Sequence, residues 1–581
     1  MRRLGRDERH RYANRVITRY LLEKGFVEQT PRQTDGHPRE LVAFEGPLPG
    51  TTPPIPIRIE ILDWDFIKYP RIMLLADPEE FRPHVDGLGC LCYLGPGAVV
   101  FDRLQPLDNL EHCLSVAAQE LTRQGSPDYR HAESRYEFAR YWSGGVYRLL
   151  GTIRPAKPLH RTQFGFIGER QFLVSDDLDE ISKIRRAILQ EKDKTHWGDQ
   201  VYPAWVITLR VDPWLDRNGP PDTWAKLWSW IDMVDPRGAA RLRSVVDGRD
   251  FAKSDLGVIV FRYATKFFGV MTSIPPEIRE SRALVKFQRG AASAIGDYLR
   301  NCAGSRIEVI TFEAMEVGEE FIYRRNLQTP HSLGGLKVHL VGAGAIGGFL
   351  AQLLTRLGAG TAGGELRIVD PEILGSENVG RHLLGIDALL QSKAMAVADF
   401  LTRQFPMSNI QGEFADALQV PNLFDCDLLI DATGEEALSL VLNEMHREHL
   451  VTNPAATPTM LFSWVLGNGE VVQCLLSDGG NHACYDCLNL PDREGLERQR
   501  FPILKERPET KLIGCHTMRP YAVTAPTTAA ALAAQMIADW KDGRPEPRFR
   551  TLYLSRGSSL HNIKGEADPE RLSGCLTCSR T

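Results

Sequence analysis

The alternation of apolar and polar positions is clearest in the C-terminal part of the chain. Residues 336–341 (LKVHLV) alternate in the way typical of a buried strand, and a glycine-rich turn follows them. An amphipathic run from about Ala345 to Gly358 predicts a helix after that turn. A strand at LRIVD, a helix around SKAMAVADFLTRQF and a strand at DLLIDAT continue the series. This β-α-β-α-β order predicts an α/β fold with a doubly wound, mostly parallel sheet.

The preceding part of the chain divides into two further segments. Residues 1–155 begin with a helix at about 7–24, continue with strands at 55–62 and 71–77, and end in two helical patterns, so we expect an α+β domain. Residues 156–325 contain the β-type runs AWVITLRVD, GVIVFRYA and RIEVITFEAM. Trp214, Trp224, Trp228 and Trp230 lie between these runs, and we interpret them as core or interface anchors. A chain of 581 residues has room for about three domains, predicted here as 1–155, 156–325 and 326–581.

Composition excludes several classes of function. The chain is 43% hydrophobic and 25% charged with a net charge of −5, so it lacks the basic footprint of a nucleic-acid or membrane-surface protein. No apolar run approaches the roughly 18 residues that a membrane-spanning helix needs. The basic N-terminal residues MRRLGRDERHRY lack the apolar core of a signal peptide. We therefore expect a cytoplasmic protein.

Cysteine spacing points to a metal site. Eleven cysteines in a cytoplasmic protein are unlike a disulfide framework, and four of them form two Cys-x-x-Cys pairs. These pairs are Cys484 with Cys487 and Cys575 with Cys578. Four thiolates suit tetrahedral Zn²⁺, so structural zinc is the favoured interpretation, with a redox pair as the alternative. The odd total leaves at least one thiol for other chemistry.

The glycine-rich turn predicts a nucleotide site. Gly342, Gly344 and Gly347 permit a tight turn and a close approach of the backbone to a ligand, and the N-terminus of the following helix favours a phosphate. Asp370 ends the next strand, where a ribose hydroxyl would bind. These residues alone leave NAD and ATP both open.

Charged residues farther along favour ATP. Arg381 and Lys393 follow the second strand, and Asp431 ends the third predicted strand. A dehydrogenase has little use for such cations, whereas a nucleotidyl transfer must neutralise a triphosphate and hold Mg²⁺ on a carboxylate. Surface cations and a helix-capping aspartate are the alternative interpretations of the separate residues.

This set of residues resembles ubiquitin-activating-type enzymes, whose bacterial relatives act in thiamine and molybdopterin biosynthesis. The resemblance covers about 250 residues. It implies ATP-dependent adenylation of a protein's C-terminal carboxylate, with Asp370 on ribose and Asp431 on Mg²⁺. It further assigns the phosphates to Asn378, Arg381 and Lys393. In this family an arginine before the first strand reaches the neighbouring subunit's site; Arg325 or Arg324 stands there, so the resemblance implies a homodimer. The family often carries a zinc site on two cysteine pairs.

Cys515, in KLIGCHTMRPYAV, lies between the two cysteine pairs. In ubiquitin-type members the thioester-forming cysteine also follows the first pair, so we expect Cys515 to attack the acyl adenylate. We expect His516 and Arg519 to lower the pKa of its thiol. A buried, inert cysteine is the alternative.

The segment YPRIMLLADPEEFRPHVDGLGCLCYL resembles the core of ubiquitin-conjugating enzymes, in which Tyr-Pro, a strand, His-Pro-Asn and a cysteine follow in order. In that family the asparagine lies eight residues before the active cysteine. Eight residues before Cys92 lies His84, so Arg82-Pro83-His84 replaces His-Pro-Asn. Cys92 also satisfies a Gly-x-x-Cys ending that Cys90 does not, so Cys92 is the expected acceptor and Cys90 the minor alternative. His84 offers a hydrogen bond from either ring nitrogen in place of asparagine. A structural domain with an accidental cysteine is the remaining alternative for this segment.

A conjugating-type domain followed by an activating-type domain resembles the fusion enzymes of bacterial anti-phage CBASS operons. That resemblance implies transfer of a cGAS-like nucleotidyltransferase's C-terminus from Cys515 to Cys92 and then to a target amine. It also implies a JAB-type deconjugating peptidase as an operon neighbour. The rivals are a sulfur-carrier activating enzyme that makes a thiocarboxylate, an NAD-dependent oxidoreductase, and a non-catalytic nucleotide-binding scaffold.

Overall fold

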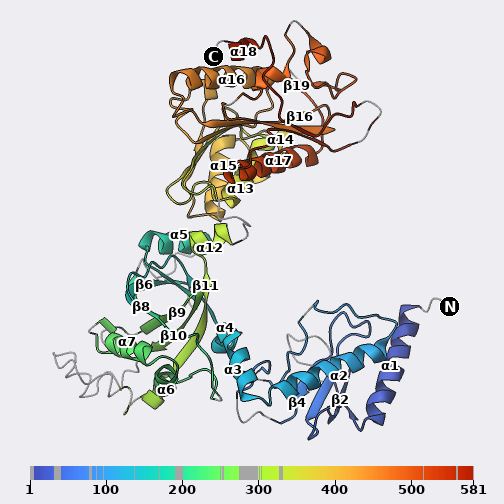
Figure 1. Cartoon of the computed structure of the whole chain (residues 1–581), viewed down its shortest axis with the longest axis vertical. Coiled ribbons are helices and arrows are strands. Elements are labelled where there is room, and N and C mark those ends of the chain that lie inside the picture. The colour runs from blue at the N-terminus through green and yellow to red at the C-terminus, as the bar shows by residue number, and fades with distance from the viewer. Residues whose placement is uncertain are drawn as a thin grey trace. The chain divides into compact units, whose positions relative to one another are not determined.

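The computed structural model describes most of the chain (Figure 1). The described residues are 5–31, 41–76, 81–86, 88–95, 97–136, 138–168, 171–189, 200–216, 218–248, 250–251, 254, 256–273, 299, 301, 304–325, 332–479, 481–491, 493–513, 516–555, 557 and 560–579. Two compact units are present. The first comprises residues 1–149, 153–165 and 201–315, and the second comprises residues 150–152, 166–200 and 316–581. Among the described residues, no helix is long and apolar enough to cross a membrane.

The N-terminal part of the first unit is a four-stranded antiparallel sheet in the order β1-β2-β3-β4, packed against helices α1 and α2. Ile17 and Leu21 of α1 and Leu114 of α2 share one core with Ile57 and Ile59 of β3. Helices α3 and α4 follow this core in the chain. The bounds are α1 Arg6–Glu23, β1 Val27–Gln29, β2 Val42–Pro47, β3 Pro56–Ile61, β4 Arg71–Leu74, α2 Pro106–Arg123, α3 Pro127–Tyr136 and α4 Phe138–Ser143.

The middle segment is dominated by a closed barrel in the strand order β10-β11-β5-β7-β6-β8-β9. Trp224, Trp228 and Trp230 are buried in an aromatic core with Trp142 of α4, which confirms their interpretation as core residues. The bounds are β5 Tyr147–Leu150, β6 Leu159–Ile167, β7 Gln171–Ser175, α5 Leu178–Leu189, β8 Val201–Thr208, α6 Trp224–Val234, α7 Pro236–Val246, β9 Leu256–Tyr263, β10 Lys266–Ser273, β11 Val309–Glu316 and α12 Glu319–Arg324.

The C-terminal segment contains an eight-stranded sheet in the order β14-β13-β12-β15-β16-β17-β20-β21. Pairing is parallel from β14 to β16 and antiparallel from β16 to β21, so the predicted doubly wound, mostly parallel sheet is confirmed. The elements are β12 Lys337–Val341, α13 Ala345–Arg356, β13 Glu365–Val369, α14 Ser376–Val379, α15 Lys393–Gln404, β14 Ile410–Glu413, β15 Leu428–Asp431, α16 Glu436–Thr452, β16 Thr459–Leu466, β17 Val471–Ser477, β18 Lys511–Ile513, β19 His516–Met518, α17 Thr524–Lys541, β20 Phe549–Tyr553, β21 Glu566–Ala567 and α18 Leu576–Ser579.

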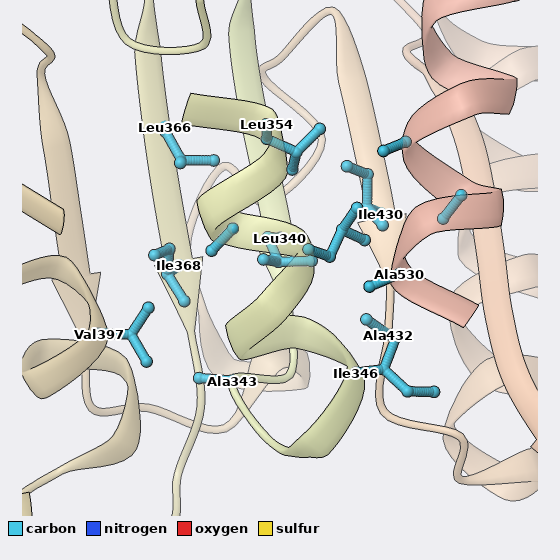
Figure 2. Close-up of a cluster of buried hydrophobic side chains, with 14 of the residues drawn as sticks. Leu340, Ala343, Ile346, Leu354, Leu366, Ile368, Val397, Ile430, Ala432 and Ala530 are labelled. Atoms are coloured by element: carbon cyan, nitrogen blue, oxygen red, sulfur yellow. The ribbon is translucent and has the colours of Figure 1, made fainter. Parts of the chain in front are cut away.

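Alternate residues of the central strands pack on opposite faces of this sheet, which explains their continuous apolar runs. Leu340, Ile368 and Ile430 belong to one buried cluster with residues of α13, α15 and α17. Figure 2 shows part of this cluster, with Ile368 on the side of Val397 of α15 and Ile430 on the side of Ala530 of α17. On the other face, residues such as Val341 and Leu429 pack with α16. Strand order reverses between β12 and β15, where open α/β sheets bind their ligands.

Candidate functional site

The glycine turn lies at this switch point, between the end of β12 and the start of α13. Gly342 adopts φ +92°, and a Cβ there would lie 2.9 Å from the Thr433 Cγ2 atom. A Cβ on Gly347 would lie 1.8 Å from the Gly342 carbonyl oxygen, so the first turn of α13 packs directly on the loop. Around Gly344, no described atom other than those of its own chain neighbours lies within 4 Å of the Cβ position. The turn is therefore closed underneath and open at Gly344, as a phosphate loop requires.

Asp370 holds the glycine turn in place. Its Oδ2 accepts the Ala343 N–H at 2.7 Å and its Oδ1 accepts the Glu372 N–H at 2.8 Å. The carboxyl is buried, and this burial raises its pKa while the two N–H donors oppose the rise. Each oxygen of this carboxylate thus already accepts one backbone N–H. Contact of Asp370 with ribose stays a prediction.

His382 is a site residue that sequence reasoning missed. Its Nδ1 accepts the Leu384 N–H at 3.0 Å, so its Nε2 carries the proton and donates to the Ala343 carbonyl at 2.6 Å. Burial lowers the pKa of the imidazole, which favours this neutral form. The peptide groups on the two sides of Ala343 are therefore fixed by Asp370 and His382. No local motif signals this contact, which joins residues 39 positions apart.

The predicted phosphate-binding cations lie in different environments. Lys393 is buried at the start of α15 and forms an ion pair with the exposed Glu372 carboxylate. Arg381 is half-buried; its guanidinium lies 5.0 Å from the Tyr521 ring centroid, and its Nη1 donates to the Arg519 carbonyl at 3.4 Å. Glu372 and Tyr521 are thus the contact partners of the two predicted phosphate-binding cations. Sequence reasoning assigned a role to neither of them.

Asn378 and Arg325, which the sequence also assigns to the ATP site, each contact a neighbouring group. Asn378 Oδ1 accepts the Gly375 N–H at 3.0 Å, which fixes the first turn of α14. Arg325 follows α12 at the surface, with its guanidinium 5.2 Å from the Phe321 ring centroid. The side chain of Arg324 lies outside the described residues.

Asp431 lies beside the glycine turn because β15 pairs with β12 in parallel register, with Asp431 opposite Val341. Its carboxylate is buried, which raises its pKa. It accepts the Thr433 hydroxyl at 2.6 Å, the Thr433 N–H at 3.0 Å and the Ser439 hydroxyl at 2.5 Å. Rotation of the two hydroxyl groups would free lone pairs of this carboxylate, which is the kind of oxygen ligand that Mg²⁺ takes. The donor type therefore suits Mg²⁺, and its binding at Asp431 stays a prediction.

A two-stranded hairpin flanks the predicted capturing cysteine. Strands β18 and β19 pair antiparallel with Ile513 opposite His516. Cys515 itself and the His516 side chain lie outside the described residues. Asn468 holds both ends of the hairpin: it donates to the Glu509 carbonyl at 2.9 Å and the Pro520 carbonyl at 3.3 Å, and it accepts the Glu509 N–H at 2.8 Å. Arg381 contacts the residues just after β19, so the base of this hairpin adjoins the predicted phosphate site.

The four paired cysteines converge, as the sequence predicts. Their sulfur atoms all lie within 4.8 Å of one another, with separations of 3.5 Å for Cys487 to Cys578 and 3.8 Å for Cys484 to Cys575. A tetrahedral zinc with Zn–S bonds of about 2.3 Å places its sulfurs about 3.8 Å apart, so the cluster fits the ion. Asn443 donates to the Cys484 sulfur at 3.5 Å, and such donors favour thiolates.

In the N-terminal sheet domain, Cys92 is exposed and Cys90 is partly buried. Burial and the nearby Asp86 carboxylate raise the pKa of the Cys90 thiol to about 11, so this thiol is protonated and poorly nucleophilic near neutral pH. The Cys92 N–H donates to the His84 carbonyl at 2.7 Å, next to an antiparallel bridge between Val85 and Leu91. The geometry thus favours Cys92 as the acceptor and places His84 opposite it.

Two domain families match the chain. Residues 323–573 match the ThiF family, and residues 28–145 match prokaryotic E2 family B. These ranges contain the glycine turn with its charged residues in one case, and His84 with Cys92 in the other.

Relatives with known names match along most of their length. One, from Pseudomonas aeruginosa (strain BWHPSA011 / Pa011), is named ATP-dependent ubiquitin transferase-like protein Cap2; it is 29% identical over 89% of this chain and 91% of the relative. A relative with the same name from Vibrio cholerae serotype O1 is 24% identical over 88% of this chain and 89% of the relative. The solved structure of E. coli MccB with ATP shares 12% identity over 61% of this chain and 85% of that chain; its TM-score of 0.31 is too low to support an argument.

Each family match agrees with the chemistry of the region that it covers. The ThiF match contains the loop, cations and carboxylates suited to ATP, and the E2 match contains an exposed thiol on a fixed loop. The chain therefore joins a prokaryotic E2 family B domain to a ThiF family domain and is an enzyme of the ubiquitin-activating and ubiquitin-conjugating type.

Proposed function

We propose that this enzyme activates the C-terminal carboxylate of a protein with ATP and transfers it through Cys515 and Cys92 to an amine. The observation that carries the proposal is the presence, in one chain, of a glycine turn that is open at Gly344, with Asp431 on the adjoining strand, and of an exposed Cys92 on the conjugating-type domain. The first feature suits adenylation, and the second suits acceptance of an acyl group.

The reaction runs in four steps. A carboxylate oxygen attacks the α-phosphate of ATP, and pyrophosphate leaves. The Cys515 thiolate then attacks the acyl adenylate, forming a thioester and releasing AMP. Cys92 displaces Cys515 by thioester exchange, which is close to energy-neutral. An amine, which we take to be a lysine, finally attacks the thioester carbonyl, and the Cys92 thiolate leaves as the amide forms.

The residues of the ThiF domain have separable tasks in the first step. The N–H groups at the start of α13 and the Arg381 and Lys393 side chains bind the phosphates, and Asp370 with His382 keeps the turn rigid. Asp431 would hold Mg²⁺, and the bound ion would supply positive charge to neutralise the phosphates. Arg325, exposed at the end of α12, serves the neighbouring subunit's site in a homodimer. Zinc on the four cysteines would tie α18 to the rest of the domain.

The expected protein substrate comes from the resemblance to the fusion enzymes of bacterial anti-phage CBASS operons. That resemblance makes a cGAS-like nucleotidyltransferase the expected protein whose C-terminus is activated, and the match to about nine-tenths of two ubiquitin transferase-like relatives supports a transfer of this type. A JAB-type peptidase encoded in the same operon would reverse the conjugation.

Pyrophosphate exchange tests the first step. With ATP, Mg²⁺ and the protein encoded next to this enzyme, radiolabelled pyrophosphate should enter ATP. The same protein with its C-terminal carboxylate amidated should support none, because it lacks the attacking oxygen. Exchange that persists with the amidated protein contradicts the proposal.

The rival functions predict other products. A sulfur-carrier activating enzyme would produce a sulfide-dependent thiocarboxylate without an adduct on Cys92, and its pathway has no use for the conjugating-type domain. An NAD-dependent oxidoreductase or a non-catalytic scaffold would give no exchange at all.

A further inference from the structure

A buried ammonium group and an exposed carboxylate form an ion pair in the ThiF domain. The Nζ of Lys393 contacts the Oε2 of Glu372, and their side chains are 6% and 67% exposed, respectively. Within the described part of the chain, Glu372 supplies the one carboxylate in ion-pair contact with this ammonium. Separation would therefore affect the two partners differently: the carboxylate would return to water, whereas the ammonium would stay shielded from it.

Lys393 lies where a cation without a partner is unfavourable. It is the first residue of α15, directly after the N-cap Ser392, and the positive end of a helix dipole disfavours a positive charge. Burial of the side chain adds to this effect. The ammonium therefore needs an anion at all times, and either Glu372 or a bound ligand can supply it.

A short series of contacts joins this ion pair to the glycine turn. The Glu372 N–H donates to the Asp370 Oδ1 at 2.8 Å, and the Asp370 Oδ2 accepts the Ala343 N–H at 2.7 Å. His382 also holds Ala343; burial is the main cause of its lowered pKa, and the charge of Lys393 lowers that pKa further. The ammonium thus acts on the groups that hold the turn.

The backbone on both sides of the ion pair is fixed. Ile373 and Ser392 form an antiparallel bridge, and the Lys393 N–H donates to the Glu372 carbonyl at 3.0 Å. The exposed Glu372 side chain can still turn away by rotation about its own χ angles. Exchange of the carboxylate for another anion therefore needs no movement of the chain.

We propose that Glu372 is a displaceable counter-ion, whose carboxylate neutralises Lys393 in the nucleotide-free enzyme and gives up the ammonium to a phosphate group when ATP binds. The inference rests on the proposed function, because it takes the predicted ATP site as given. No covalent bond changes in this exchange, and the ammonium stays paired in both states. The carboxylate weakens the binding of ATP, because the nucleotide must first displace it.

Calorimetric titration of the full-length, zinc-loaded enzyme with Mg²⁺ and the non-hydrolysable analogue α,β-methylene-ATP tests this exchange. We expect Glu372→Gln to bind the analogue about 10-fold more tightly than the unaltered enzyme, the gain expected if the carboxylate occupies Lys393 about nine-tenths of the time. Glu372→Asp should gain nearly as much, because its shorter side chain keeps the charge but does not reach the ammonium.

Two further variants separate this exchange from a general effect of charge. Glu377→Gln removes an exposed carboxylate from α14, a few residues farther along the same segment, and should leave the affinity for the analogue unchanged. Lys393→Met removes the ammonium and keeps an unbranched side chain. In that background Glu372→Gln should bring no gain in affinity, because the carboxylate acts through Lys393.

Other roles for Glu372 give different results. If its carboxylate held the ribose or Mg²⁺, Glu372→Gln would bind the analogue more weakly. If it acted only through its charge at a distance, Glu372→Asp would bind as the unaltered enzyme does, and if it had no role, Glu372→Gln would do so too. Each of these results overturns the inference and leaves the ATP site standing. An unaltered enzyme that does not bind the analogue contradicts both the inference and the proposed function.

Discussion

Replacement of Arg381 by alanine is expected to lower ATP–pyrophosphate exchange by about 10³-fold or more, the effect of losing a cation from the transferring phosphates. Arg381 directly precedes His382, which holds the glycine turn. The Arg381 guanidinium is oriented by the Tyr521 ring and the Arg519 carbonyl. The measurement is the initial rate of exchange at saturating ATP, Mg²⁺ and protein substrate.

Arg356→Ala is the matched control for this change. Its guanidinium also lies over an aromatic ring, 5.3 Å from the Phe405 centroid, but on the last turn of α13, away from the glycine turn. Exchange should be unchanged in that variant. Tyr521→Ala keeps the cation and removes only its support, so we expect a smaller loss than in Arg381→Ala. Near-normal exchange in Arg381→Ala would remove this residue from the phosphate site.

Loss of the metal from the cysteine cluster is expected to have the second-largest effect. Structural zinc binds small peptides with about 10–16 kcal/mol of apparent free energy near pH 7, and part of this becomes folding stability. Cys487→Ser should abolish binding of one Zn²⁺ per chain and lower the melting temperature of the ThiF domain by many degrees. Metal content and calorimetry measure the two effects, and a strong chelator should reproduce them in the unaltered protein.

Cys474→Ser controls for the loss of a buried thiol. Cys474 is buried in β17, outside the cluster, and its sulfur donates to the Ser463 hydroxyl at 3.4 Å. That variant should keep its zinc and lose little stability. A protein that contains no zinc, and whose melting temperature is the same in Cys487→Ser, would instead support four unrelated core thiols or a redox pair.

Much of the ThiF domain could be predicted from the sequence because its signals are local. The glycine turn fixes the start of α13 at Ala345, and the apolar runs mark β12, β13 and β15. Strand β14 (IQGE) was missed, because it lies at the edge of the parallel series and has only one strongly apolar residue. The pattern of buried positions carries little information for such a short edge strand.

The residues that support the site were beyond sequence reasoning for a different reason. His382 contacts Ala343, and Glu133 contacts His84, across 39 and 49 positions of the chain respectively. Neither contact leaves a spacing pattern, since each depends on how separate elements pack. The cysteine pairs were predictable because the chemistry of zinc demands four sulfur ligands, whatever the distance between the pairs.

The relay itself is tested most directly on a non-reducing gel, with ATP, Mg²⁺ and the protein encoded next to this enzyme. The unaltered enzyme should form adducts that disappear on addition of reductant. Cys92→Ala should retain an adduct on Cys515 alone, Cys515→Ala should form none, and Cys90→Ala should behave as the unaltered enzyme does. An adduct on Cys92 that persists in Cys515→Ala would contradict the account, because another group would then make the first capture.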